Sequence, residues 1–191
     1  MGGARARRPA ALGGVLRGGP LVDPGGLREK VGAYLGAHRV LVLCTHGPEG
    51  PWASPVYYAS DSSLSLYFFS DPETRHGRNL ARRGWASGAV TEEYERWEEI
   101  QGVQLEGPVD VLTGPEREAA LRVYLCKYPW ARAFLSPEGA FFAAVGSKMA
   151  LYRLRPVRAG FTDNRQGFGH RDWLEFSEST TPEGRSEGPW L

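Results

Sequence analysis

The chain has 191 residues, 41% of them hydrophobic, with 23 Lys and Arg against 22 Asp and Glu. This length suits one well-buried domain rather than two, and the balanced charge excludes the overall positive field that draws a protein to nucleic acid. The two cysteines, Cys44 and Cys126, are isolated from each other and offer neither a disulfide framework nor a paired metal-ligand spacing. We therefore expect a cytoplasmic protein without a metal site.

The two ends of the chain differ in composition from its middle. Residues 1–20 carry arginines and a weakly apolar run interrupted by glycines, which falls short of a secretory signal. No other segment has the unbroken apolar length that a membrane span needs. We expect a flexible arm over residues 1–26, one folded domain over 27–175 and a polar tail over 176–191.

The first expected elements are a helix and three strands. Residues 27–37 place apolar side chains on one face at helical spacing, directly after the breaker Pro-Gly-Gly. Strands are expected over residues 38–45, 53–60 and 63–70, because these runs are rich in β-branched and aromatic residues. Turn-forming residues separate the runs, so the pattern indicates a meander.

Basic residues begin directly after the third strand, in DPETRHGRNLARRGW. Helical spacing predicts a short amphipathic helix with Thr74 as N-cap, and it divides the residues between one face (Gly77, Leu80, Ala81, Gly84) and the opposite one (Arg75, Arg78, Asn79, Arg82). Cations in a first helical turn oppose the helix dipole, so an anion bound there would resolve the conflict.

The residues that such an anion would meet are the hydroxyls and cations around the start of this helix. Ser70, Thr74, Arg75 and His76 can together hold a phosphate. The alternative is a solvated basic face, and we favour it for Arg78, Arg82 and Arg83.

The second half of the chain adds strands and a broken helix. Strands are expected over residues 85–93, 97–112 and 149–161, with Gly102 and Gly107 marking bends or bulges in the middle one. Residues 113–135 have helical periodicity that Pro129 interrupts. The segment GFTDNRQGFGHRDW, residues 160–173, has the composition of a loop that closes a pocket, although a crossover without chemistry fits it equally. About six strands with two or three helices favour a small antiparallel barrel with helices packed outside.

Several of these segments together resemble a known family. ASPVYYAS, SLSLYFFSDPETRH and IQGVQLEGPVDVL, in this order, resemble the pyridoxamine 5'-phosphate oxidase-like FMN-binding split barrels. TRH, IQGVQ and GFTDNRQGFGHRDW are most similar to the YhbP-like branch, and the resemblance covers roughly residues 27–175. It implies a mainly β fold, a six-stranded antiparallel split β-barrel with peripheral helices. It also implies FMN as the cofactor and a homodimer that shares each flavin between its subunits.

The resemblance also implies which residues contact FMN. The strand beside the flavin ring matches Ser54, Pro55, Val56 and Tyr57. The strand end at the phosphate matches Phe69 and Ser70, and the hydroxyl and basic pair that follow match Thr74, Arg75 and His76. A glutamine that reaches the flavin corresponds to Gln101 or Gln104, and the choice depends on whether a glycine bulge shifts the register. Trp130, Phe168 and Trp173 are candidates for the partner subunit's half of the pocket.

Departures from the family pattern limit the implied activity. Ser54 and His76 stand where oxidases of pyridoxamine phosphate have an arginine and a lysine, and their C-terminal arginine-histidine motif has no clear match. The resemblance thus implies an FMN-dependent oxidoreductase that acts on another small molecule. The alternatives are a split barrel that binds heme or a deazaflavin, and a noncatalytic dimeric module.

Overall fold

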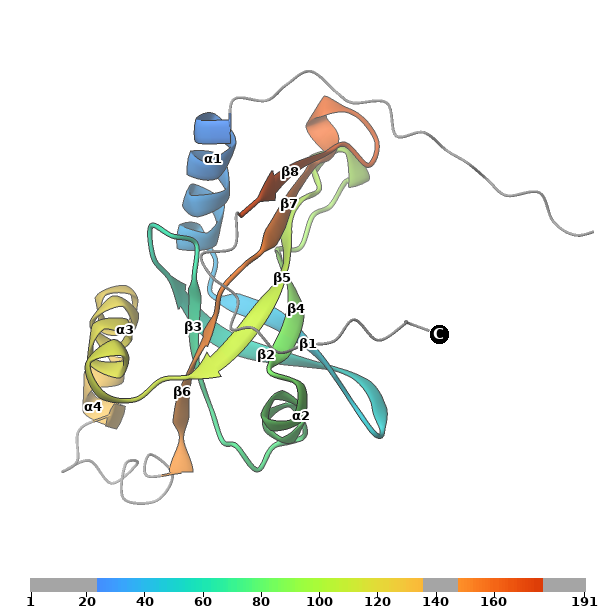
Figure 1. Cartoon of the computed structure of the whole chain (residues 1–191). Coiled ribbons are helices and arrows are strands. Elements are labelled where there is room, and N and C mark those ends of the chain that lie inside the picture. The colour runs from blue at the N-terminus through green and yellow to red at the C-terminus, as the bar shows by residue number, and fades with distance from the viewer. Residues whose placement is uncertain (1–23, 136–147, 177–191) are drawn as a thin grey trace, which may run out of the picture.

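The structure is a computed structural model that describes residues 24–135 and 148–176. Within these residues, eight strands and four α-helices make up the fold (Figure 1). The strands are β1 (Val40–Gly47), β2 (Gly50–Ser60), β3 (Leu66–Ser70), β4 (Trp85–Thr91), β5 (Gln101–Val111), β6 (Ala150–Leu154), β7 (Arg158–Asp163) and β8 (Arg171–Glu175). The helices are α1 (Pro24–Ala37), α2 (Arg75–Arg83), α3 (Gly114–Lys127) and α4 (Ala131–Leu135). Residues 1–23 of the expected arm and 177–191 of the expected tail lie outside the described residues.

Six of the strands close into an antiparallel barrel. Their order is β4-β1-β2-β3-β6-β5, and β4 pairs with β5 to complete the circle. Strands β7 and β8 extend the sheet beyond β5, so that β5 pairs with β7 over its first half and with β6 near its end. This arrangement confirms the predicted mainly β class and the six-stranded antiparallel split barrel with peripheral helices.

Two details of the predicted strands are wrong. The expected strand over 149–161 is two strands, because the chain crosses from β6 to β7 at Pro156, which lacks the N–H that a ladder needs. Of the bends or bulges predicted at Gly102 and Gly107, the bulges are absent, since β5 pairs with β4 one residue to one from Gly102 to Pro108. Gly107 is needed instead because a Cβ there would overlap the Arg155 carbonyl oxygen.

Element ends also differ from the predictions where side chains or tertiary contacts decide them. Residues 63–65 precede β3 rather than starting it, because the Asp61 carboxylate accepts hydrogen bonds from the backbone N–H groups of Ser63 and Ser65. Residues 97–99 form a 3-10 helix, η1 (Trp97–Glu99), before β5 begins. The predicted break at Pro129 is confirmed, since α3 ends at Lys127 and α4 starts at Ala131.

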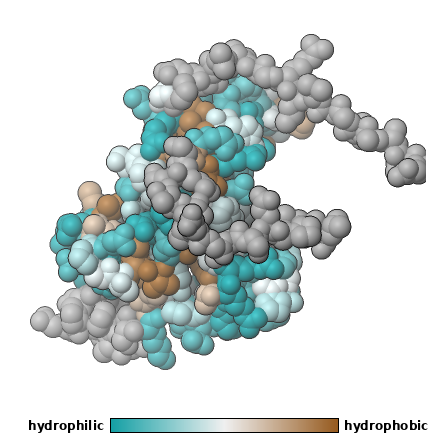
Figure 2. Space-filling view, in the orientation of Figure 1, coloured by the Kyte–Doolittle hydropathy of each residue, from teal (hydrophilic) through white to brown (hydrophobic). Residues whose placement is uncertain are grey.

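The helices cover separate parts of the barrel. Leu27, Val31 and Leu35 of α1 are buried in the main core together with inward side chains of the strands. Tyr124 of α3 packs with Tyr128 in a second cluster against β2 and β3. Figure 2 shows hydrophobic surface beside α3 among mostly hydrophilic residues. Among residues 24–135 and 148–176, the structure contains no helix with the length and apolar character of a membrane span.

Candidate functional site

The start of α2 is built by Thr74, as predicted. The Thr74 hydroxyl accepts a hydrogen bond from the Gly77 N–H at 3.1 Å and donates to the Asp71 carbonyl oxygen at 2.7 Å. Gly77 allows this tight approach, because a Cβ there would overlap the Pro72 carbonyl oxygen. The hydroxyl takes the N–H of the third helical residue, so the N–H groups of Arg75 and His76 remain at the helix end for an anion.

The buried face of α2 is only partly the predicted one, because Gly77 and Leu80 are buried as expected but Asn79 and Ala81 are exchanged. Asn79 is buried and donates from Nδ2 to the Thr45 hydroxyl at 3.1 Å, whereas Ala81 is exposed. The helix packs against β1, and Gly47 leaves the space that the Asn79 side chain fills. Helical spacing alone predicted that the apolar residues of α2 face inward. The buried hydrogen bond from Asn79 to β1 instead turns Asn79 inward and Ala81 outward.

His76 links α2 to two strands. Its Nδ1 lies 3.1 Å from the Ser54 hydroxyl of β2 and its Nε2 lies 2.5 Å from the Ser70 hydroxyl of β3. All three side chains are buried, and burial lowers the pKa of His76. The imidazole is therefore neutral at pH 7, and one nitrogen donates to a hydroxyl while the other accepts from one.

Arg75 points from the first turn of α2 toward the β1–β2 hairpin. Its Nη2 donates to the Glu49 carbonyl oxygen at 2.7 Å, and its Cζ lies 4.5 Å from the centre of the Trp52 ring. Its Nε is buried and has no hydrogen-bond partner among the described residues, since Glu49 Oε2 is 3.6 Å away. This nitrogen therefore forms an ion pair with Glu49 but has no hydrogen-bond acceptor among the described residues.

A groove runs along the outer face of β4. A cavity of about 1010 Å³ is lined by Cys44, Ser87 and Trp85 of the sheet and by Arg82 and Arg83 of α2. A smaller hollow of about 420 Å³ shares Cys44 and Ser87 and continues toward β7 and β8. Arg82 and Arg83 are exposed, as expected, but they border this groove instead of facing only bulk water.

One row of paired residues crosses the outer face and shows which candidates meet there. Consecutive Cα partners join Pro55, Val42, Ala89, Gln104, Gly160 and Trp173 across β2, β1, β4, β5, β7 and β8. Directly paired residues point to the same face of a sheet. The row therefore brings Pro55 and Gln104 to one surface, about 14 Å apart across three strand spacings.

Alternation along β2 divides its four candidates. Pro55 and Tyr57 are exposed on the outer face, whereas Ser54 is buried and Val56 packs against the core. Tyr57 meets Tyr128 and Trp130 edge-on, with ring centres 5.7 and 6.4 Å apart. Phe69 packs edge-on against Tyr124 at 5.0 Å, on the α3 side of the barrel.

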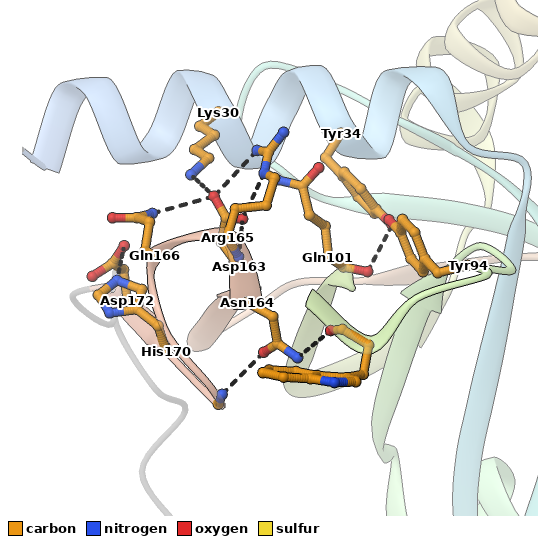
Figure 3. Close-up of polar contacts among 12 residues, drawn as sticks. Lys30, Tyr34, Tyr94, Gln101, Asp163, Asn164, Arg165, Gln166, His170 and Asp172 are labelled. Atoms are coloured by element: carbon orange, nitrogen blue, oxygen red, sulfur yellow. Dashed lines mark hydrogen bonds and ion pairs between the residues drawn. The ribbon is translucent and has the colours of Figure 1, made fainter. Parts of the chain in front are cut away.

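The two glutamines also lie on opposite faces of β5. Gln104 lines the smaller hollow. Gln101 lies at the start of the strand, where its carbonyl oxygen accepts a hydrogen bond from the Tyr34 hydroxyl of α1 at 3.0 Å (Figure 3). No bulge shifts the register between them, so Gln104 is the glutamine that shares a surface with Pro55.

Asp163, at the end of β7, organises the segment between β7 and β8 (Figure 3). Its buried carboxylate accepts hydrogen bonds from Lys30 Nζ and Arg165 Nε, both at 2.9 Å, and from Gln166 Nε2 at 3.2 Å. Burial raises the pKa of this carboxyl, but the hydrogen bonds from Arg165, Lys30 and Gln166 outweigh it and hold the pKa well below its usual value. The predicted pocket-closing loop is thus anchored to α1 and begins and ends in strands.

A chain of hydrogen bonds beside this segment was not predicted from the sequence. Arg171 Nε donates to the Thr162 hydroxyl at 3.0 Å, and that hydroxyl donates to Gln104 Oε1 at 3.2 Å. The Trp173 ring lies across Gly160, where a Cβ would approach it to 2.8 Å. Gly160 and Thr162 alternate with Phe161 at the two-residue spacing of a strand. This spacing is the sequence signal that could have predicted that the strand continues past residue 161.

Comparisons with known proteins agree with this architecture. UPF0306 protein YhbP of Salmonella paratyphi A is 28% identical over 151 residues, which cover 78% of this chain and 94% of that protein. A heme binding protein from Mycobacterium smegmatis superposes with a TM-score of 0.62 and 24% identity over 78% of this chain, which spans only 57% of that protein. General Stress Protein 26 from Bacillus anthracis gives a TM-score of 0.55 and 14% identity over 78% of this chain and 98% of that one. At these identities the two structures show the fold alone.

The sequence profile of one family matches most of the folded region. The profile is described as pyridoxamine 5'-phosphate oxidase, and it matches residues 27–162, from α1 to the second half of β7. This range includes the barrel strands, α2 and the row that joins Pro55 to Gln104. The chain therefore belongs to the pyridoxamine 5'-phosphate oxidase family.

Proposed function

We propose that this protein is a homodimeric FMN-binding flavoprotein that acts as an oxidoreductase on a small molecule. The observation that carries the proposal is the buried Arg75 Nε, which has no hydrogen-bond partner among the described residues. A phosphate monoester supplies the missing acceptor, and a guanidinium is the side chain best suited to bind it. The N–H groups at the start of α2 and its positive dipole end add to the same anion site.

The remaining candidates support FMN in two different ways. Thr74 and His76 fix the position of the α2 N-terminus, and Ser54 and Ser70 act through His76 because their hydroxyls are already bound to it. The outer-face residues offer a surface for a planar ring, with Pro55 and Tyr57 on β2. An FMN site needs this combination of an anion site and an apolar surface.

When bound, FMN supplies two-electron transfer, and the chain's own residues hold and orient it. The inner side of the site differs from what a phosphorylated substrate needs, because Ser54 is buried and engaged by His76. We therefore propose that the substrate of this protein is a small molecule other than pyridoxamine phosphate.

The experiment that tests the proposal is an FMN titration of purified protein. We expect the purified protein to be yellow, or to bind added FMN and quench its fluorescence. Arg75→Gln should weaken FMN binding about 10- to 100-fold, because a charged hydrogen bond to the phosphate is lost. The matched control is Arg122→Gln, which removes an exposed arginine of α3 and should leave FMN affinity unchanged.

Two outcomes of this titration would count against the proposal. A protein that is colourless and does not respond to FMN cannot be an FMN flavoprotein. Equal losses of affinity in Arg75→Gln and Arg122→Gln would show that net charge, not the α2 N-terminus, governs binding.

Heme binding is the second candidate function. The observation that favours it is the groove beside β4, where Cys44 and exposed His46, two side chain types that ligate heme iron, line the same cavity. The M. smegmatis neighbour, described as a heme binding protein, shares the fold. An absorption spectrum after addition of hemin separates the two functions, because ligated heme gives a Soret band that His46→Ala would shift and that FMN cannot produce.

A further inference from the structure

The feature that carries a further inference is the polar chain from Arg171 through Thr162 to Gln104. Arg171 lies on β8 directly opposite Thr162 of β7, so the two side chains are brought together by strand register. The donor–acceptor distances along the chain are 3.0 and 3.2 Å. Thr162 is buried, whereas Arg171 is exposed.

The hydrogen bonds from Arg171 through Thr162 orient the Gln104 amide, so that one end of it faces the hollow. A guanidinium can only donate hydrogen bonds, so the Thr162 hydroxyl accepts from Arg171. The hydroxyl proton is then available for Gln104, whose carbonyl oxygen Oε1 accepts it. A hydroxyl can accept two hydrogen bonds and donate one, and in the structure the Thr162 hydroxyl uses its proton for Gln104 Oε1. The NH2 group of Gln104 therefore points away from Thr162.

The hollow around Gln104 has an aromatic wall, and its other polar side chains are Ser87, Glu106 and Arg158. Ala89 and Gly160, the Cα partners of Gln104, offer no polar side chain. Trp173 lies across Gly160, and Arg158 Cζ is 3.8 Å from the centre of the Trp173 ring. A planar group that enters this hollow of about 420 Å³ meets the NH2 of Gln104 as a directed donor.

The Asp163 cluster (Figure 3) lies directly beside Thr162 and Arg171 along the polypeptide. Asp163 follows Thr162 directly, and its carboxylate is tied to Lys30 on α1 and to Arg165 at the start of the segment that leads to β8. The carbonyl oxygen of His170, the residue before Arg171, accepts a hydrogen bond from the Asp163 N–H at 3.0 Å. Both ends of the segment between β7 and β8 are thus held, and Arg171 therefore lies beside Thr162.

We infer that Thr162 and Arg171 are positioning residues that aim the NH2 of Gln104 at a carbonyl oxygen on the pyrimidine edge of the flavin ring. This inference rests on the proposed FMN function and adds the polarity of the contact. A donor at this edge stabilises the negative charge that the ring gains on reduction, so it favours reduced flavin over oxidised flavin.

The test compares Thr162→Val, which removes the hydroxyl, with Thr162→Ser, which keeps it. Thr162→Val should weaken binding of oxidised FMN about three- to tenfold, because the amide is no longer oriented. It should also lower the reduction potential of bound FMN, whereas Thr162→Ser should restore both quantities. Thr113→Val, at an exposed threonine without a side-chain cap bond, is the control for loss of a hydroxyl and should match wild type.

A second pair of variants keeps the test independent of folding effects at Thr162. Arg171→Met removes the donor that sets the polarity, at an exposed position, and should lower the reduction potential in the same direction. Gln104→Glu replaces the NH2 with a carboxylate oxygen and should weaken FMN binding more than Thr162→Val does.

The outcomes separate this inference from the function on which it rests. Wild-type protein that binds no FMN overturns the proposed function. Wild-type protein that binds FMN, together with Thr162→Val and Arg171→Met proteins of unchanged potential and affinity, overturns the positioning role alone.

Discussion

His76 shows how one side chain can fix the position of a helix against two strands. Each ring nitrogen meets a hydroxyl from a different strand, so a single imidazole sets the distance between α2, β2 and β3. The arrangement requires the neutral ring, and burial favours that form by lowering the pKa of His76. A lysine at this position would have no acceptor for Ser54 or Ser70 to donate to.

Replacing His76 should destabilise the fold in a pH-dependent way. His76→Gln should reduce the free energy of unfolding by about 1–3 kcal/mol at pH 7, because buried hydroxyls lose their partners. In wild type the folded-state pKa lies below the unfolded value of about 6.5, so this stabilisation is complete above pH 6.5 and declines as the pH falls below it. Urea denaturation between pH 8 and pH 5 measures the difference between the two proteins.

The control for this prediction is His46→Gln, which removes an exposed imidazole. We expect His46→Gln to keep the wild-type free energy of unfolding at pH 7. If the difference between His76→Gln and wild type stayed constant down to pH 5, His76 would not be buried in its neutral form.

At the scale of elements, the segment between β7 and β8 depends on one buried carboxylate. Asp163 is 2% exposed and accepts hydrogen bonds from α1 and from its own segment. Asn164 adds a hydrogen bond from Nδ2 to the Trp97 carbonyl oxygen at 2.7 Å, which ties η3 (Asn164–Gln166) to η1. The segment is therefore fixed at two points, to α1 and to η1.

Removing the charge of Asp163 should loosen this segment and lower stability. Asp163→Asn should reduce the free energy of unfolding by about 2–4 kcal/mol at pH 7, because buried donors lose their carboxylate. The folded-state pKa of this carboxyl lies below the usual value of about 3.9, so its contribution is present above pH 3.9 and is lost as the pH falls through the acid range. Denaturant titrations at pH 7 and pH 3 should show a smaller gap between the variant and wild type at pH 3.

Asp110 provides the comparison for that measurement. It pairs with Arg153 and Arg155 on the surface and is 39% exposed, so Asp110→Asn should cost less than about 1 kcal/mol. Equal losses from Asp163→Asn and Asp110→Asn would contradict the structural role of the Asp163 cluster.

Local sequence patterns predicted which helices and strands form better than they predicted where these elements end or which face of each is buried. The Thr74 cap and the break at Pro129 were predictable because each depends on residues a few positions away. The inward position of Asn79 on α2 was not, because it depends on a hydrogen bond to Thr45, 34 residues earlier. The choice between Gln101 and Gln104 likewise needed the pairing of β5 with both neighbours, which no local pattern contains.

At the scale of the whole molecule, the outer face of the barrel has the character of an interface. Large hydrophobic side chains are more than a third exposed on neighbouring strands there: Val40 41%, Val42 38%, Tyr57 51%, Trp85 41% and Trp173 42%. Apolar surface of this kind, next to a groove, is typical of a surface that another chain covers. This supports the proposed homodimer with the flavin at its interface.

A charge on this face should separate the subunits. Val42→Glu should shift the protein from dimer to monomer in sedimentation velocity experiments and weaken FMN binding, because the interface would bury an unpaired carboxylate. Val111→Glu makes the same change at a 56% exposed position near the end of β5 and should leave the dimer intact. A wild-type protein that remains monomeric at micromolar concentration would rule out this assembly.

The most direct test of the account compares FMN with riboflavin, which has the same ring without the phosphate. Titration calorimetry should give one FMN per chain and an affinity for FMN at least tenfold above that for riboflavin, because Arg75 and the α2 N-terminus receive the phosphate. Arg75→Gln should remove most of this preference. Equal affinities for FMN and riboflavin in wild type, or no binding of either, would contradict the account.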